Sequence, residues 1–209
     1  NMLDSYLTES IIGKAIENKL IEVHTYALRE FTVDKHRRVD GKPYGGGPGK
    51  VMWVDPIIRT VESINKKLAK KKNVKAKVII FSPGGKQFTN VIAKQSVKKY
   101  TDIIFICGRY EGIDERVKKI LKAELWSVGP YVLTGGELPA MICIDAITRQ
   151  IDGVLHAEDS LEDKRVASHE IYARPEVYEH KGKKYKVPKV LLSGNHKRIE
   201  EYRMKKENT

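Results

Sequence analysis

Three apolar runs, each followed by a glycine-containing loop and an amphipathic segment, constrain the fold of this chain more than any other feature. The runs span residues 76–81, 102–107 and 125–133. The spacing of apolar residues predicts helices over 87–99, 113–122 and 138–150. Apolar strands that alternate with helices are typical of a mainly parallel sheet with helices on both faces. The sequence therefore predicts an α/β fold.

The loops that follow the three runs are the expected place of a ligand site. They read "SPGGK" at 82–86, "GRYEG" at 108–112 and "TGGE" at 134–137. Open parallel sheets bind ligands outside the carboxyl ends of their strands, where such loops meet. Glycine lets backbone N–H and C=O groups come close to a ligand because it has no Cβ.

The N-terminal third is less regular. Apolar spacing predicts a helix over 4–18, alternation predicts a strand over 20–28, and a polar loop follows over 29–50. The next helix is predicted to begin with Asp55 as its N-cap and Pro56 in its first turn. Because translation starts at Met, Asn1 predicts that the parent chain carries roughly ten more residues, enough for a strand and a turn.

The sequence lacks the motifs of several common classes of enzyme. "YGGGPGK" at 44–50 fails the phosphate-loop pattern, because Tyr44 and Val51 stand where Gly and Ser or Thr are required. The chain has no G-x-G-x-x-G fingerprint, no zinc-type His/Cys spacing and no G-x-S-x-G elbow. Cys107 and Cys143 lie in apolar runs, which favours buried thiols in the cytoplasm. No apolar run has the length of a membrane span.

Charge indicates a polyanionic partner. The chain has 39 Lys and Arg against 27 Asp and Glu, a net charge of +12. Residues 164–209 alone contain 13 Lys and Arg against 6 Glu. A basic appendage on a nearly balanced body is typical of nucleic-acid binding, while a solvated lysine-rich surface remains the alternative.

Five stretches together carry a family resemblance. They are "HRRVDGKPYGGGPGKVM", "CGRYEGIDERV", "WSVGPYVLTGGELPAMICIDAITR", "YARPEV" and "VPKVLLSGNH". In this order they resemble the bacterial tRNA (guanine-37-N1) methyltransferases of the knotted, SPOUT-class superfamily. The resemblance implies an α/β domain with a deep C-terminal trefoil knot over residues 1–155, a linker over 156–170, and a small, basic, mostly helical tRNA-contacting domain over 171–209. It also implies a homodimer with the active site at the subunit interface.

The resemblance implies S-adenosyl-L-methionine as the cofactor and leaves Mg²⁺ open as a second one. The cofactor-binding residues that it implies lie in the three loops and at the ends of their strands. They are Phe81, Ser82, Pro83, Gly108, Tyr110, Glu111, Val128, Gly129, Pro130, Tyr131, Val132, Leu133, Gly135 and Gly136. Pro130 stands where many members of the family carry Asp.

The resemblance also assigns catalytic and RNA-binding residues. Asp163 is the implied base for the proton on guanine N1, with Asp159 and Glu162 as rivals, and Arg149 is the implied cation near O6. The implied RNA contacts are Asp40, Arg174, Ser193, Asn195 and His196.

The implied activity is methyl transfer to N1 of guanine 37 in tRNA, next to the anticodon. A member of the same fold that binds RNA but has lost catalysis is the alternative. A knotted relative that methylates ribose 2′-OH is a third reading, and it would lack "YGGGPGK" and "LLSGNH".

Overall fold

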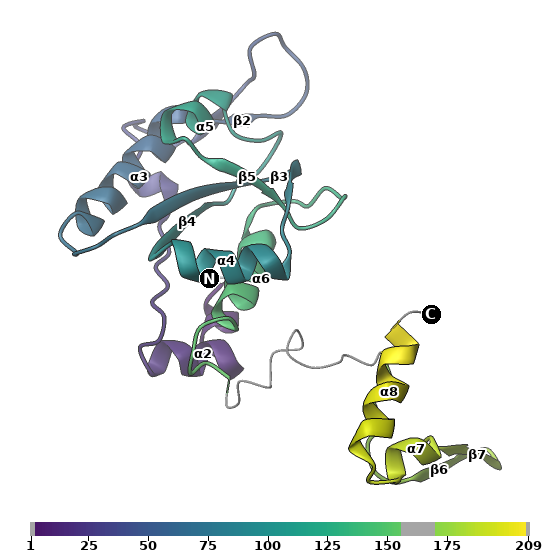
Figure 1. Ribbon diagram of the computed structural model, residues 1–209. Helices are drawn as coiled ribbons and strands as arrows, with labels where there is room; N and C mark the ends of the chain where they lie inside the picture. The colour runs from purple at the N-terminus through teal and green to yellow at the C-terminus, as the bar shows by residue number, and fades with distance from the viewer. Residues whose placement is uncertain (1–2, 156–169, 208–209) are drawn as a thin grey trace. The chain divides into compact units, whose positions relative to one another are not determined.

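The computed structural model describes residues 3–155 and 170–207 of the protein (Figure 1). The chain separates into two compact units, Asn1–Val154 and Leu155–Thr209. Within the described residues, no helix has the length and apolar composition needed to cross a bilayer.

The first unit is built on a three-stranded parallel sheet. Strands β3 (Ala76–Gln87), β4 (Asp102–Ile106) and β5 (Glu124–Ser127) lie in the order β4-β3-β5. Helices α3 (Val54–Leu68) and α5 (Glu115–Leu121) cover one face, while α4 (Asn90–Lys99) and α6 (Glu137–Thr148) cover the other (Figure 1). The prediction of an α/β fold with a parallel sheet is confirmed.

Alternation along β3 divides the hydrophobic core between the two faces of the sheet. Successive strand side chains point to opposite faces. Ile80 packs with Ile57 and Val61 of α3. Its neighbour Ile79 packs with Trp126 of β5 and Cys143 of α6. Each face therefore has its own core, which fixes both helix layers against one central strand.

Strand β3 continues through the segment that the sequence predicts as a loop. Phe81 and Lys86 both pair with Trp126 of β5, so the register shifts between them. A Cβ on Gly85 would lie 2.7 Å from the carbonyl carbon of Leu125. Only glycine fits that contact, and the prediction of a simple loop over 82–86 is wrong because pairing with β5 extends the strand.

The N-terminal segment also differs from the prediction. Two helices, α1 (Asp4–Leu7) and α2 (Ser10–Glu17), replace the single helix expected over 4–18, because Ser10 has a φ of 54°. The segment 20–28 pairs with no strand within the described residues, and its alternation in exposure breaks at His24 and Thr25, which are both exposed. The strand prediction is wrong there, since alternation alone supplies no hydrogen-bonding partner. The short 3₁₀ helix η1 (Leu28–Glu30) follows.

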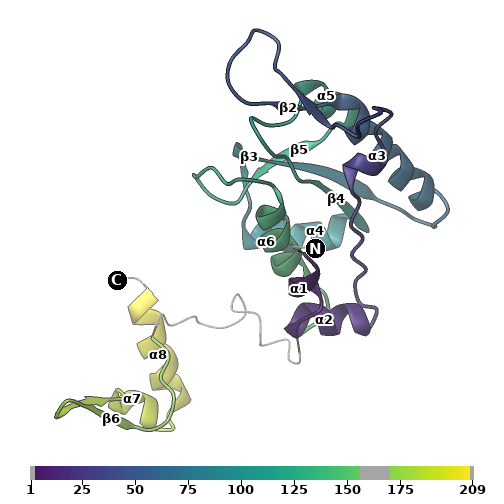
Figure 2. The same cartoon turned by 180° about the vertical axis from the view of Figure 1, so that it is seen from behind.

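Helix α1 is attached to α6 by a side-chain contact. The Tyr6 hydroxyl donates a hydrogen bond to Asp145 Oδ2, and α1 lies beside α6 (Figure 2). This hydrogen bond, followed by burial and the charge of Asp145, raises the pKa of Tyr6 to about 12.

Helix α3 begins earlier than predicted. Its N-cap is Trp53, so Asp55 is not the N-cap but a first-turn residue. The Asp55 carboxylate accepts a hydrogen bond from Arg59 Nε at 2.8 Å, one turn along the helix. Ahead of α3, the antiparallel pair β1 (Asp40–Gly41) and β2 (Val51–Met52) closes the base of the glycine-rich loop 42–50.

The second unit combines a hairpin with two helices. Strands β6 (Val177–His180) and β7 (Lys183–Lys186) pair antiparallel, and helices α7 (Lys189–Leu192) and α8 (His196–Glu207) follow. Lys181 and Gly182 connect the strands with φ values of 49° and 74°, as the tight turns of two-residue hairpins require. The hairpin is not part of the sequence-based prediction of a mostly helical domain.

Candidate functional site

A cavity of about 390 Å³ lies at the carboxyl ends of the parallel strands. Its walls come mainly from residues 81–83 inside β3, residues 108–115 after β4, and residues 127–129 and 131–136 at the end of β5 and after it. The ends of parallel strands meet at one edge of a sheet, so loops distant in sequence become neighbours there. The structure therefore builds a ligand-sized hollow where the sequence places the glycine loops.

The residues that the resemblance assigns to the cofactor meet in this cavity, with one exception. Those that line it are Phe81, Ser82, Pro83, Gly108, Tyr110, Glu111, Val128, Gly129, Tyr131, Val132, Leu133, Gly135 and Gly136. Pro130 is the exception, because it is exposed and is not among the lining residues.

Gly136 holds two of the loops together through the backbone. Its N–H donates a hydrogen bond to the Gly108 carbonyl at 2.9 Å, and the neighbouring Gly135 forms a bridge with Arg109. A Cβ on Gly136 would lie 2.6 Å from the Cα of Cys107. The glycine pair therefore allows the start of α6 to contact the end of β4 directly.

An ion pair reinforces the same junction. Arg109 Nε donates to Glu137 Oε1 at 2.9 Å, and Glu137 lies in the first turn of α6, where the helix dipole favours a negative charge. Sequence reasoning missed this pair, although opposite charges in adjacent loops are a usable signal. Burial, followed by the nearby Glu137 carboxylate, raises the pKa of Cys107 to about 12, so this thiol stays protonated.

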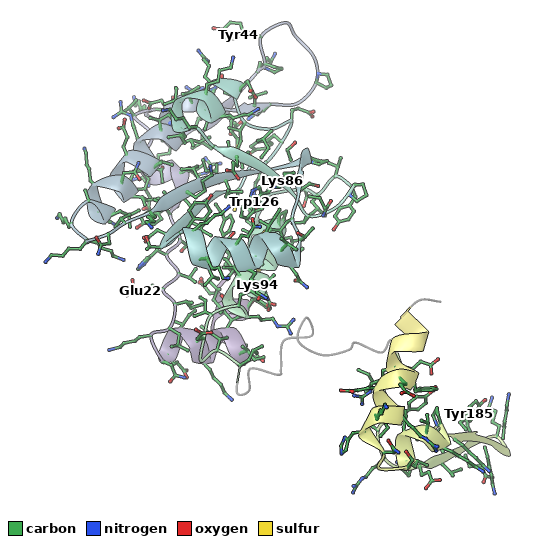
Figure 3. The ribbon with its side chains drawn as sticks, in the orientation of Figure 1. Glu22, Tyr44, Lys86, Lys94, Trp126 and Tyr185 are labelled. Atoms are coloured by element: carbon green, nitrogen blue, oxygen red, sulfur yellow. The ribbon has the colours of Figure 1, made fainter. Side chains whose placement is uncertain are left out.

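The glycine-rich loop 42–50 is anchored next to the cavity. The Glu111 N–H donates to the Lys50 carbonyl at 3.0 Å, and Lys50 Nζ lies 2.7 Å from Asp40 Oδ2. The Asp40 contact is an ion pair without good hydrogen-bond geometry, since Oδ2 accepts no well-aligned hydrogen bond. The side chain of Asp40 is only 5% exposed. Tyr44, at the tip of the loop, is fully exposed (Figure 3).

Arg149, one of the two implied catalytic residues, does not line the cavity. Arg149 is the C-cap of α6, whereas Gly136 at the other end of that helix lines the cavity. A helix of 12 residues is roughly 18 Å long. Asp163 and its rivals Asp159 and Glu162 lie outside the described residues.

The implied RNA-binding residues of the second unit are exposed, and two of them shape a turn. The Ser193 hydroxyl donates to the Val190 carbonyl at 2.7 Å, and Asn195 Oδ1 accepts from the Arg198 N–H at 3.2 Å. Both contacts stabilise the connection between α7 and α8. Arg174 precedes Pro175, and His196 is the first residue of α8.

Within residues 3–155 and 170–207, no group of three or more His, Cys, Asp or Glu side chains could hold a metal ion.

Comparison with known proteins gives a match over the full sequence. The family model described as tRNA (Guanine-1)-methyltransferase TrmD matches residues 1–209. A tRNA (guanine-N(1)-)-methyltransferase of Clostridioides difficile is 45% identical over 206 residues, covering 97% of this chain and 86% of that protein. Proteins with the same name in Dictyoglomus turgidum and Thermomicrobium roseum are 46% and 44% identical, covering 94% and 97% of this chain and 76% and 73% of their own lengths.

Proposed function

The chain belongs to the tRNA (guanine-1)-methyltransferase family, and from that premise we propose that it transfers a methyl group from S-adenosylmethionine to N1 of guanine 37 in tRNA. The observation that carries the proposal is the convergence of three separate sequence segments on one cavity. Those segments contain the residues that family resemblance assigns to the methyl donor. The two free cysteines of the chain fit a location in the cytoplasm, where tRNA is found.

The cavity suits a donor of this size and chemistry. Its volume of about 390 Å³ is within the range of small-molecule sites. Phe81, Val128 and Leu133 offer apolar contacts, and Gly135 and Gly136 expose backbone groups without a Cβ. Glu111 places a carboxylate in the wall, which favours a cation. When bound, S-adenosylmethionine supplies a methyl group on a positively charged sulfur.

The chain's own contribution is to prepare the acceptor. Guanine N1 carries a proton, and it becomes a strong nucleophile only as that proton leaves. Asp163 is proposed as the base that accepts the proton. Arg149 is proposed to stabilise the negative charge that develops towards O6.

Helix α6 supports a homodimer with a shared site. Its first turn borders the cavity, while Arg149 follows its last residue, Thr148, roughly 18 Å away. An arginine side chain cannot span that distance, so Arg149 of a second copy is proposed to complete the site. Leu138 and Ile142 lie on one stripe of α6 and are 47% and 46% exposed, which fits burial against that copy.

The activity is tested by single-turnover methylation with radiolabelled S-adenosylmethionine. The substrates are two unmodified tRNA transcripts that differ only in having G or A at position 37. We expect label on the G37 transcript alone, located at N1. Binding of both transcripts without methylation of either would instead support the RNA-binding alternative.

The shared site is tested by mixing two inactive variants. Arg149→Ala removes the cation, and Gly136→Ala disturbs the donor cavity. If each site uses both chains, random exchange of subunits should restore about a quarter of the parent activity, because half of the dimers carry one intact site. If each chain supplies its own site, the mixture stays as inactive as either variant alone.

A further inference from the structure

The hairpin β6–β7 has two chemically different faces. Its register places Tyr178 opposite Tyr185 and His180 opposite Lys183. Alternate residues share a face, so these four side chains lie together. The opposite face carries Val177 opposite Lys186, and Glu179 opposite Lys184. Both tyrosines therefore share one face with His180 and Lys183, and the only carboxylate of the two strands lies on the other face with Lys184 and Lys186.

The aromatic face is open to solvent. Tyr178 is 61% exposed and Tyr185 is 51% exposed. Lys183 Nζ lies 5.3 Å from the centroid of the Tyr185 ring, so a cation borders an accessible ring. The two exposed rings occupy directly opposite positions on the hairpin, so they are neighbours on its surface rather than scattered exposed residues.

The chemistry of this face suits one class of partner. Proteins that bind single-stranded nucleic acids combine aromatic rings, on which bases stack, with positive charges along the phosphate backbone. The surrounding sequence supplies that charge, with 13 Lys and Arg against 6 Glu over residues 164–209. An apolar protein partner would not require the lysines.

We propose that Tyr178 and Tyr185 form a stacking platform for unpaired bases of the RNA substrate, with Lys183 next to the phosphates. The proposal rests on the proposed function for the identity of the RNA as tRNA. It adds a binding surface in the second unit, made of residues that are not among those lining the methyl-donor cavity. Duplex RNA offers no free base faces, so the platform discriminates in favour of loops.

The test measures tRNA affinity over a series of salt concentrations. Replacing either tyrosine by alanine should weaken binding by about 5- to 150-fold per stacked base, without changing the slope of log Kd against log salt. Tyr178→Phe and Tyr185→Phe keep the ring and should bind within about 2-fold of the parent. Lys183→Gln should instead reduce the slope, because it removes a phosphate contact.

Val177→Ala is the matched control, since Val177 lies on the opposite face of the same hairpin. It should leave both affinity and slope unchanged. Binding of a fully duplex RNA should not respond to the tyrosine variants. Thermal unfolding identifies any alanine variant that loses the hairpin. For such a position, the tRNA affinity of the phenylalanine variant is compared with that of the parent instead.

The proposal is overturned if the alanine variants bind tRNA like the parent, or if phenylalanine weakens binding as much as alanine. Methylation is measured separately with the parent chain. A parent that binds tRNA through these tyrosines but transfers no methyl group would reject the proposed function and keep the platform. A parent that methylates G37 with no tyrosine effect would reject the platform alone.

Discussion

Replacing Gly136 by alanine should force helix α6 away from the end of strand β4. The new Cβ would lie 2.6 Å from Cys107 Cα and 2.9 Å from Gly108 N. Both are backbone atoms, so no side-chain rotation can relieve the contact. The N–H of Gly136 would also lose its position relative to the Gly108 carbonyl, now 2.9 Å away.

The magnitude follows from three terms. Overpacking against backbone costs about 1–3 kcal/mol, and a weakened hydrogen bond costs about 1 kcal/mol. Alanine restricts the unfolded chain and returns about 0.4–1 kcal/mol. The net loss is roughly 1–3 kcal/mol, which lowers Tm by about 2–4 °C per kcal/mol in a chain of this size.

Gly84→Ala is the matched control, because a Cβ on Gly84 meets nothing within 4 Å and its φ is not left-handed. That variant should be neutral or more stable by up to about 1 kcal/mol. The assays are thermal unfolding and calorimetric titration with S-adenosylmethionine. Equal Tm and equal donor affinity in the two variants would refute the argument that Gly136 is required by close backbone contact.

Three further predictions address the base, the RNA and pH. Asp163→Asn should keep donor affinity while slowing single-turnover methylation by about 10²-fold or more, and an unchanged rate would exclude Asp163 as the base. Neutralising three hairpin lysines should reduce the salt slope of tRNA binding by up to about one unit per lost phosphate contact, and equal slopes would contradict it; the lysines are Lys183, Lys184 and Lys186. Tyr6 has its pKa raised from 10.0 to about 12 in the folded protein, so its contribution to the free energy of unfolding is present below pH 10 and is lost as pH rises towards 12. Tyr6→Phe should therefore lose less stability than the parent over that interval, as measured by denaturant titrations at each pH.

The position of the cavity could be predicted from sequence because the same local pattern occurs three times along the chain. Each apolar run is followed by a glycine-containing segment, and parallel strands bring such segments to one edge of the sheet. The continuation of β3 through 82–87 could not be predicted in this way. Pro83, Gly84 and Gly85 favour a turn by local rules, and only pairing with Trp126, about 40 residues later, makes the segment a strand.

Two other differences have related causes. Lysine is depleted in strands, so the Lys183–Lys186 strand gave no sequence signal, although it is fixed by its tight turn and its partner. Segment 20–28 shows the reverse case, since it has the alternation of a strand but no strand partner among the described residues. The Arg109–Glu137 ion pair became evident only when the loops after β4 and β5 were adjacent.

The central position of β3 also bears on how the protein is made. β3 pairs with β4 and with β5, but β5 and the turn at Gly136 lie later in the chain. A ribosome that adds about 5–20 residues per second needs roughly 1–4 s to pass from the end of β4 to the end of β5 at Ser127. During that interval one edge of β3 lacks its β5 partner, and unpaired strand edges promote aggregation. Synonymous codons that slow translation through residues 107–127 would lengthen this exposure and lower the yield of folded enzyme without changing a single amino acid.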